Sequence, residues 1–230
     1  METHGAIMVG MEKESAPEPT VATANRPKRR HGLLRDMLQM VVVVFIVYFG
    51  FRAILLPYQV DGASMTPYLE NGERVFVSRT SYAHLDTNDL WNILPWEHRD
   101  SDKDVFLFDP PKRGDIVVLH PPYESEEPYI KRVIGLPGET VTFADGSVLI
   151  DGVPLVEEYI AEDITWCSGG PWCEVAVPED SVYVVGDNRQ NSTDSRKFGP
   201  VSYDQIIGKA IFSSWPTDTF GAIDRPDYTP

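Results

Sequence analysis

Residues 37–56 read MLQMVVVVFIVYFGFRAILL, an almost uninterrupted apolar run that only Gln39 and Arg52 interrupt. About 20 apolar residues are what an α-helix needs to cross the hydrocarbon core of a bilayer. Arg52 stands near one end, from where its long side chain can reach the headgroups. The run therefore predicts a single transmembrane helix over 37–56. It divides the chain into a segment before it, 1–36, and a longer part after it, 57–230.

The charges are distributed unevenly about this run. The 230 residues contain 20 Lys and Arg against 35 Asp and Glu, a formal net charge of -15. Residues 57–230 hold 13 basic and 30 acidic residues, or -17, which excludes nucleic-acid binding through bulk positive charge. The stretch from Arg26 to Arg35 contains no acid. Because basic flanks stay in the cytoplasm, this stretch predicts a cytoplasmic N-terminus and a translocated 57–230.

Two other interpretations of the run fit less well. A cleaved secretory signal has a shorter apolar core and small residues at its cleavage site, whereas the best frame here, Asp61-Gly62-Ala63, contains a carboxylate. A buried core helix that is apolar on every side would need a larger globule than this chain can build. Residues 1–25 are rich in Ala, Pro, Glu and Thr, so 1–36 is expected to be a disordered tail with a basic end.

After the run, the sequence changes to short segments of β-branched and aromatic residues bounded by Gly, Pro, Asn or Asp. These segments are 75–77, 115–119, 129–134, 140–143, 148–150 and 182–185. They predict a mostly β domain, and no long amphipathic helix follows Leu56. Asp151-Gly152 is typical of a type I′ turn. Together with the turn at 144–147, it predicts a small meander over 140–156.

The two cysteines, Cys167 and Cys173, enclose Ser-Gly-Gly-Pro-Trp. A zinc half-site would need a second pair of Cys or His ligands, which the sequence lacks. In a translocated domain we therefore expect a local disulfide that fixes one surface loop. We expect no bound metal.

The first segment with candidate chemistry is Gly62-Ala-Ser-Met-Thr-Pro-Tyr-Leu69, in which Ser64 stands between small residues. Ser64 alone is more typical of an ordinary turn residue than of a nucleophile. A nucleophilic serine also needs a base, and the histidines after the run (His84, His98 and His120) have no persuasive context. A lysine that has lost its charge through burial is the alternative.

The second segment, Tyr129-Ile-Lys-Arg-Val-Ile134, offers such a lysine. The period of two in a strand places Lys131 on the face of Tyr129 and Val133. Burial there would lower the pKa of Lys131 by roughly 2 to 3 units, enough for its amine to take a proton from a serine near neutral pH. A lysine whose stem lies across the sheet with its amine in water is the alternative.

The third segment, 184–201, is dense in Gly, Asp, Asn and Ser. Asp194 precedes Arg196 by two residues, close enough for a bidentate ion pair that would hold the loop in shape. A surface turn explains this composition by itself. Beside the other two segments, the loop is predicted to form the wall of a site.

Together, these motifs resemble the type I signal peptidase (leader peptidase) family. In the family's order they are Gly62–Leu69 after a signal-anchor helix, Arg113–Val118, Tyr129–Glu139, and Gly186–Arg196 with Phe198-Gly-Pro200. The resemblance implies an antiparallel β catalytic domain. It also implies a membrane-bound serine endopeptidase, a hydrolase without cofactor, that removes signal peptides from translocated preproteins. Cleavage would follow small residues at the first and third positions before the cut, the Ala-X-Ala pattern.

The resemblance also implies a role for each site residue. Ser64 would be the nucleophile and Lys131 the general base of a Ser/Lys dyad that works through an acyl-enzyme. Ser192 would orient the lysine amine, and the supporting residues would be Gly186, Asp187, Asn188, Asp194 and Arg196. The position two before the nucleophile is a serine in some members and Gly62 here. The donor that joins the Ser64 backbone N–H in binding the oxyanion therefore stays open.

The partners implied are preproteins with signal peptides, the lipid bilayer of a plasma membrane and, close by, the secretion translocon. Two other functions would leave different traces. A self-cleaving repressor type of Ser/Lys protease would lack the anchor, and an inactive anchored binding module would not need both dyad residues. A penicillin-binding type would need Ser-x-x-Lys, which is absent. Trp91–Trp96 fits an interfacial membrane contact and a packed loop equally. No role can be assigned to the insertion 81–111 from its sequence.

Overall fold

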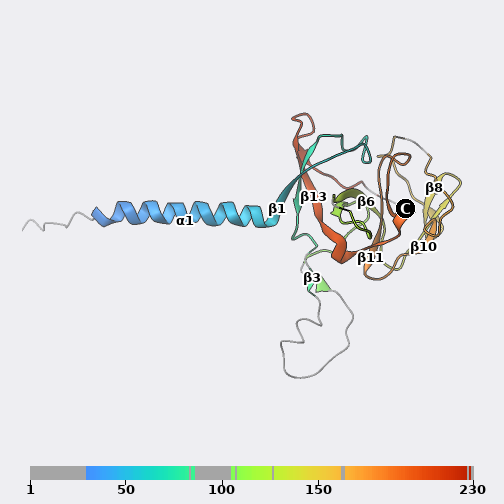
Figure 1. Ribbon diagram of the computed structural model, residues 1–230, viewed down its shortest axis with the longest axis horizontal. Helices are drawn as coiled ribbons and strands as arrows, with labels where there is room; N and C mark the ends of the chain where they lie inside the picture. The colour runs from blue at the N-terminus through green and yellow to red at the C-terminus, as the bar shows by residue number, and fades with distance from the viewer. Residues whose placement is uncertain are drawn as a thin grey trace, which may run out of the picture. The chain divides into compact units, whose positions relative to one another are not determined.

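The computed structural model describes residues 30–82, 84–85, 105–106, 108–125, 127–161, 164–226 and 228. Trp91–Trp96 and most of the insertion 81–111 lie outside these residues. The helix α1 runs from Arg30 to Ile54, drawn in blue in Figure 1. Its part Gly32–Ile54 has a mean hydropathy of 2.1 and, by length and composition, can cross a membrane. None of this apolar window is buried. A core helix would have to be buried, so this finding speaks against that interpretation.

The helix ends earlier than the apolar run predicts. Leu55 and Leu56 belong to the first strand, β1 (Leu55–Gln59), where they lie opposite Ser78 and Val77 of β2 (Arg74–Ser78). The reason is Pro57, because a proline disfavours the helical conformation of the residue before it. The chain thus passes directly from the helix into the sheet.

Most strands form one large antiparallel sheet (Figure 1). Its order is β1, β2, β13 (Ile206–Trp215), β5 (Ile116–Leu119), β6 (Tyr129–Gly135), β11 (Ser181–Val185) and β12 (Val201–Ser202), with β14 (Gly221–Ala222) beside β13. A second sheet has the order β10 (Glu174–Ala176), β7 (Thr140–Ala144), β8 (Ser147–Ile150) and β9 (Val153–Pro154). A two-stranded ladder joins β3 (His84–Leu85) and β4 (Val105–Phe106). After α1, the helices in the described part of the chain are the short α3 (Ser195–Phe198) and a 3₁₀ turn at Tyr203–Gln205.

The prediction of a mostly antiparallel β domain after one apolar helix is confirmed, including the meander. Its strands β7, β8 and β9 follow one another as antiparallel neighbours. Asp151 and Gly152 have φ of 50° and 80°, the left-handed values that a type I′ turn requires. All six predicted strand segments are present. The longest strand, β13, was not among them.

Among the described residues, the buried apolar side chains form three clusters. The first contains Met65 and Leu69, which are buried against Val75, Val77 and Val118 and so fix the segment that carries Ser64. The second packs Val117, Val133 and Val184 of the neighbouring strands β5, β6 and β11. The third joins the two sheets through residues such as Ile134, Val141 and Tyr183. Burial of apolar surface contributes about 25 cal/mol per Å², so this packing helps to hold β6 in place.

Strand β13 lies between β2 and β5, and Gly208 allows this close approach. A Cβ at Gly208 would overlap the backbone carbonyl of Ser78 on β2. A Cβ at Gly221 of β14 would meet nothing within 4 Å. The absence of a side chain at Gly208 therefore makes room for the β2 backbone at Ser78.

We predict that Gly208→Ala destabilises the domain by about 2 kcal/mol, because the added methyl group forces two paired strands apart. Gly221→Ala is the matched control and should change stability by less than about 1 kcal/mol. Urea unfolding of the full chain in detergent, followed by tryptophan fluorescence, measures both. Equal stability of the two variants would contradict the close approach at Gly208.

Candidate active site

Ser64 and Lys131 meet although 67 positions separate them in the chain. The Lys131 Nζ donates a hydrogen bond of 2.9 Å to the Ser64 Oγ. Ser64 lies in the turn after β1, where Leu69 N–H donates to the Met65 carbonyl at 2.9 Å and both apolar side chains are buried. Lys131 lies in β6, opposite Val117 of β5. Core packing on one side and strand pairing on the other thus hold the hydroxyl and the amine together.

The Lys131 side chain is buried, with only 4% of the residue exposed. Its Nζ also donates to the Ile130 carbonyl at 2.7 Å and lies 5.2 Å from the centroid of the Tyr129 ring. Burial lowers the pKa of Lys131 from 10.5 to about 8, while the nearby carboxylates of Asp194 and Asp187 oppose that shift. At pH 7, about one amine in ten is then neutral and able to accept a proton.

The loop 186–192 packs directly on the serine. The Asn188 backbone N–H donates to the Ser64 carbonyl at 3.0 Å, and the Asn188 Nδ2 donates to the Thr66 Oγ1 at 3.0 Å. Gly186 has no room for a side chain, because a Cβ there would overlap Ser192 Oγ and the Ser64 carbonyl oxygen. The loop therefore fixes the backbone that carries the hydroxyl.

Ser192 is buried beside Gly186 in this loop. Its hydroxyl makes no hydrogen bond to Lys131 in the described structure, where the amine donates to Ser64 and to the Ile130 carbonyl. An ammonium has three N–H donors, so one position on Lys131 is open for a further acceptor. The orienting role of Ser192 stays a prediction.

Asp194 and Arg196 form the bidentate pair that their spacing suggested. The Arg196 Nε and Nη2 donate to the two carboxylate oxygens at 2.8 and 2.7 Å. Asp194 also accepts from the Gly186 backbone N–H at 3.1 Å and caps α3 by accepting from the Arg196 N–H. Burial raises the pKa of Asp194, but the hydrogen bonds from Arg196 outweigh it, so that the pKa lies below its usual value. Asp194 thus ties α3 to the loop that packs on Ser64.

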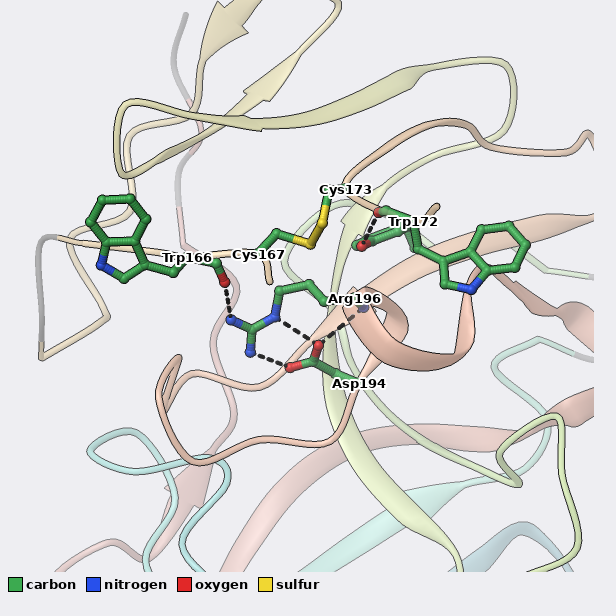
Figure 2. The surroundings of a disulfide bond; sticks show 7 residues. Trp166, Cys167, Trp172, Cys173, Asp194 and Arg196 are labelled. Carbon is green, nitrogen blue, oxygen red and sulfur yellow. Dashed lines mark hydrogen bonds and ion pairs between the residues drawn. A yellow bond between two sulfur atoms is a disulfide. The ribbon is translucent and has the colours of Figure 1, made fainter. Parts of the chain in front are cut away.

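Cys167 and Cys173 form a disulfide, and residues of the loop that they close line a pocket together with Arg196. Figure 2 shows Arg196 between the Asp194 carboxylate and the backbone carbonyl of Trp166, to which its Nη1 donates at 3.0 Å. The Trp172 carbonyl accepts from the Tyr183 hydroxyl at 2.8 Å. The described residues contain no group of three or more His, Cys, Asp or Glu side chains that could hold a metal ion.

Gly62 has a φ of +86°, which favours glycine, and its N–H donates to the Asn71 Oδ1 at 2.9 Å. This N–H is therefore engaged and not free to bind an oxyanion in this conformation. A Cβ at Gly62 would meet no atom within 4 Å. The backbone conformation, and not crowding, is what favours glycine at this position.

Arg132 is a further residue of the site, and it was not among the predicted site residues. Arg132 is fully buried, and its Nε and Nη2 donate to the Asp187 carboxylate at 2.8 and 2.6 Å. Burial lowers the pKa of Arg132, but the bidentate hydrogen bond to Asp187 outweighs it and leaves the pKa raised. An arginine in a strand with both faces buried needs a carboxylate partner. This requirement could have pointed to Arg132 from the sequence, because Asp187 lies in the loop that was predicted to form the wall of the site.

A cavity of about 460 Å³ opens beside the dyad. Ser64, Lys131 and Thr193 line it together with Val75, Val118, Ile130 and other residues of β1 and β6. A larger cavity of about 710 Å³, between Tyr82, Lys112 and Arg225, includes neither dyad residue. Only the first cavity brings a bound molecule next to a buried amine and a hydroxyl.

Comparisons with known proteins identify the family of this chain. The sequence model of the family described as signal peptidase, peptidase S26, matches residues 33–215. A signal peptidase I of Leptolyngbya laminosa is 35% identical over 219 residues, which cover 90% of this chain and 92% of the relative. Signal peptidase I P of Bacillus subtilis subsp. natto is 33% identical over 203 residues, covering 84% and 96%. A crystal structure of a signal peptidase I from Enterococcus faecalis V583 shares 36% identity and covers 44% of this chain and 97% of that chain, with a TM-score of 0.39.

The predicted resemblance is thus confirmed by a family match over most of the chain and by relatives matched over nearly their whole length. These relatives are peptidases, which also confirms the expectation of a hydrolase that processes signal peptides. The chain belongs to the signal peptidase family, peptidase S26.

Proposed function

We propose that this protein removes signal peptides from preproteins with Ser64 as nucleophile and Lys131 as general base. The observation that carries the proposal is the 2.9 Å hydrogen bond between a buried lysine amine and a serine hydroxyl in a cavity wall. A serine hydroxyl is a weak nucleophile until a neighbouring base takes its proton. A lysine with a pKa of about 8 can do so near neutral pH.

The proposed reaction has two halves. The neutral Lys131 amine takes the Ser64 proton as the Ser64 oxygen attacks the scissile carbonyl, and the resulting ammonium protonates the leaving amine. The acyl-enzyme that remains is then hydrolysed by a water molecule that Lys131 deprotonates. The Ser64 backbone N–H is one donor for the oxyanion. Because the Gly62 N–H donates to Asn71, the second donor is not that group unless the turn rearranges.

The membrane arrangement is part of the same proposal. Residues 1–36 form a cytoplasmic tail, 37–56 anchor the chain as a single helix, and 57–230 form a peptidase domain on the far side of a plasma membrane. The basic stretch before the apolar run supports this orientation. Only seven residues, Pro57 to Ala63, separate the run from Ser64, which limits the site to at most about 25 Å from the interface. The bilayer and the translocon would then both lie near the site, where a signal peptide emerges from its own apolar segment.

We predict that Ser64→Ala and Lys131→Met each abolish cleavage of a preprotein by the full-length protein in detergent, because each removes one partner of the proton transfer. His120→Ala is the control, since a Ser/His enzyme would need a histidine where this proposal needs none. The measurement is the appearance of the mature N-terminus by mass spectrometry. Undiminished cleavage by either dyad variant would exclude that residue, and no cleavage by the wild type would indicate an inactive binding module.

The cleavage rate should also depend on pH. Since the neutral amine is the active form and its pKa is about 8, kcat/KM should rise about tenfold per unit below pH 8 and level off above it. A peptide with blocked termini keeps the substrate's own amine from titrating. A profile that stays flat between pH 6 and pH 9 is incompatible with Lys131 as the base.

We propose the Ala-X-Ala specificity that the resemblance to the family implies. The apolar side chains of Val75, Val118 and Ile130 in the cavity lining support uncharged residues before the cut. Replacing the alanine at the last position before the cut by phenylalanine should lower kcat/KM about 100-fold or more. A serine at the same position should be tolerated. Equal rates for alanine and phenylalanine peptides would exclude a small-residue pocket.

A further inference from the structure

The Arg132 guanidinium lies in a buried aromatic cage next to the dyad. Its carbon atom lies 4.5 Å from the centroid of the Tyr68 ring and 4.2 Å from that of Tyr159. Besides the bidentate pair with Asp187, its Nη1 donates to the Gly114 carbonyl at 3.0 Å. A cation over aromatic rings is stabilised most when water is excluded. The stabilisation of the Arg132 guanidinium by these rings therefore depends on the segment that keeps water out of the cage.

The C-terminal segment, defined here as residues 223–226 and 228, provides that closure. The Tyr68 hydroxyl donates to the Asp224 carbonyl at 2.7 Å, and the Tyr228 ring meets the Tyr159 ring edge to face, 6.0 Å between centroids. Gly114 has a φ of +88°, and a Cβ there would lie 2.6 Å from the Tyr228 ring. The segment thus contacts both tyrosines of the cage and the strand connection that accepts from Arg132.

Two short paths connect this cage with the reacting groups. Asp187, held by Arg132, is flanked by Gly186 and Asn188, and the Asn188 N–H donates to the Ser64 carbonyl. Lys131 precedes Arg132 in β6, so a shift of Arg132 along the strand moves the lysine as well. Tyr68 follows Ser64 in the same buried turn. A displacement of the cage would reach the serine and the lysine together.

We propose that Tyr228 is a positioning residue of the peptidase. Through the Tyr159 ring it holds the Arg132–Asp187 ion pair, and through that pair it keeps Ser64 and Lys131 in reacting geometry. This inference rests on the proposed dyad. Tyr228 touches neither the dyad nor the cavity beside it, and it lies 97 positions after Lys131. Its contribution is to exclude water from the cage and to prevent Arg132 and Asp187 from separating.

The test is Tyr228→Ala in the full-length protein, with a blocked peptide substrate. We expect kcat to fall about tenfold while KM changes less than twofold, because the substrate cavity is untouched. The pKa seen in the pH profile should move upward. The charged and titratable groups around Lys131 are Asp187, Asp194 and the Tyr129 ring, together with Asp61 and Glu127, which line the same cavity. Water in the cage would leave the Asp187 charge less neutralised by Arg132, and a stronger negative charge near Lys131 raises the lysine pKa.

Two variants distinguish positioning from general stability. Tyr228→Phe keeps the ring and should retain wild-type kcat. Asp218→Ala, at an exposed position of the β13–β14 connection, should change neither kcat nor the pH profile. If Tyr228→Ala does not fold, Tyr68→Phe replaces it, because it removes only the hydrogen bond to Asp224. We expect a fall of about threefold in kcat and the same upward shift of the pKa for this variant.

The proposal is overturned if Tyr228→Ala, or Tyr68→Phe in its place, keeps the wild-type kcat and pH profile, whether or not its unfolding temperature falls. This outcome is distinct from failure of the proposed dyad. In that case Lys131→Met would remain active, whatever the result at Tyr228.

Discussion

The site depends on the removal of one amine from water. A pKa of Lys131 lowered from 10.5 to about 8 corresponds to about 3 kcal/mol that favours the neutral over the charged amine. Because the folded pKa is lowered, the unfolded chain binds more protons between pH 8 and pH 10.5. Folding stability should therefore increase with pH through this window and carry the full cost of a buried ammonium below it. The apolar packing of β5, β6 and β11 offsets that cost.

The neighbouring residue in the same strand solves the opposite problem. Arg132 keeps its charge at every accessible pH, so its burial requires a permanent anion, and the Asp187 carboxylate supplies it. Burial raises the pKa of Asp187 while Arg132 opposes that rise, and with a guanidinium as partner the pair is ionised at neutral pH. The alternation of a strand sends these two side chains to opposite faces. A neutral amine and a buried ion pair can thus be adjacent in sequence without cancelling one another.

The sequence was sufficient where short-range patterns decide the structure. Alternating β-branched residues located β2, β5 and β6, and the same alternation placed Lys131 on a face with Tyr129. It was insufficient where the decisive contact joins distant segments. The partner of Arg132 is 55 positions away. In β13, Gly208 and Lys209 interrupt the apolar pattern and by themselves suggest a turn. Only the structure shows that the Ser78 backbone occupies the space beside Gly208.

The alternation in β6 also limits how this strand can change by insertion and deletion. A slip of one residue between β5 and β6 would place Arg132 opposite Val117, where Lys131 now lies. A guanidinium does not release its proton at physiological pH, so Ser64 would face a permanent cation in place of the proposed base, and Asp187 would lose its partner. A shift by two residues would restore the faces, but it would move the amine by about 7 Å along the strand. The register of the β5–β6 pairing is therefore as necessary to the proposed dyad as the side chains themselves.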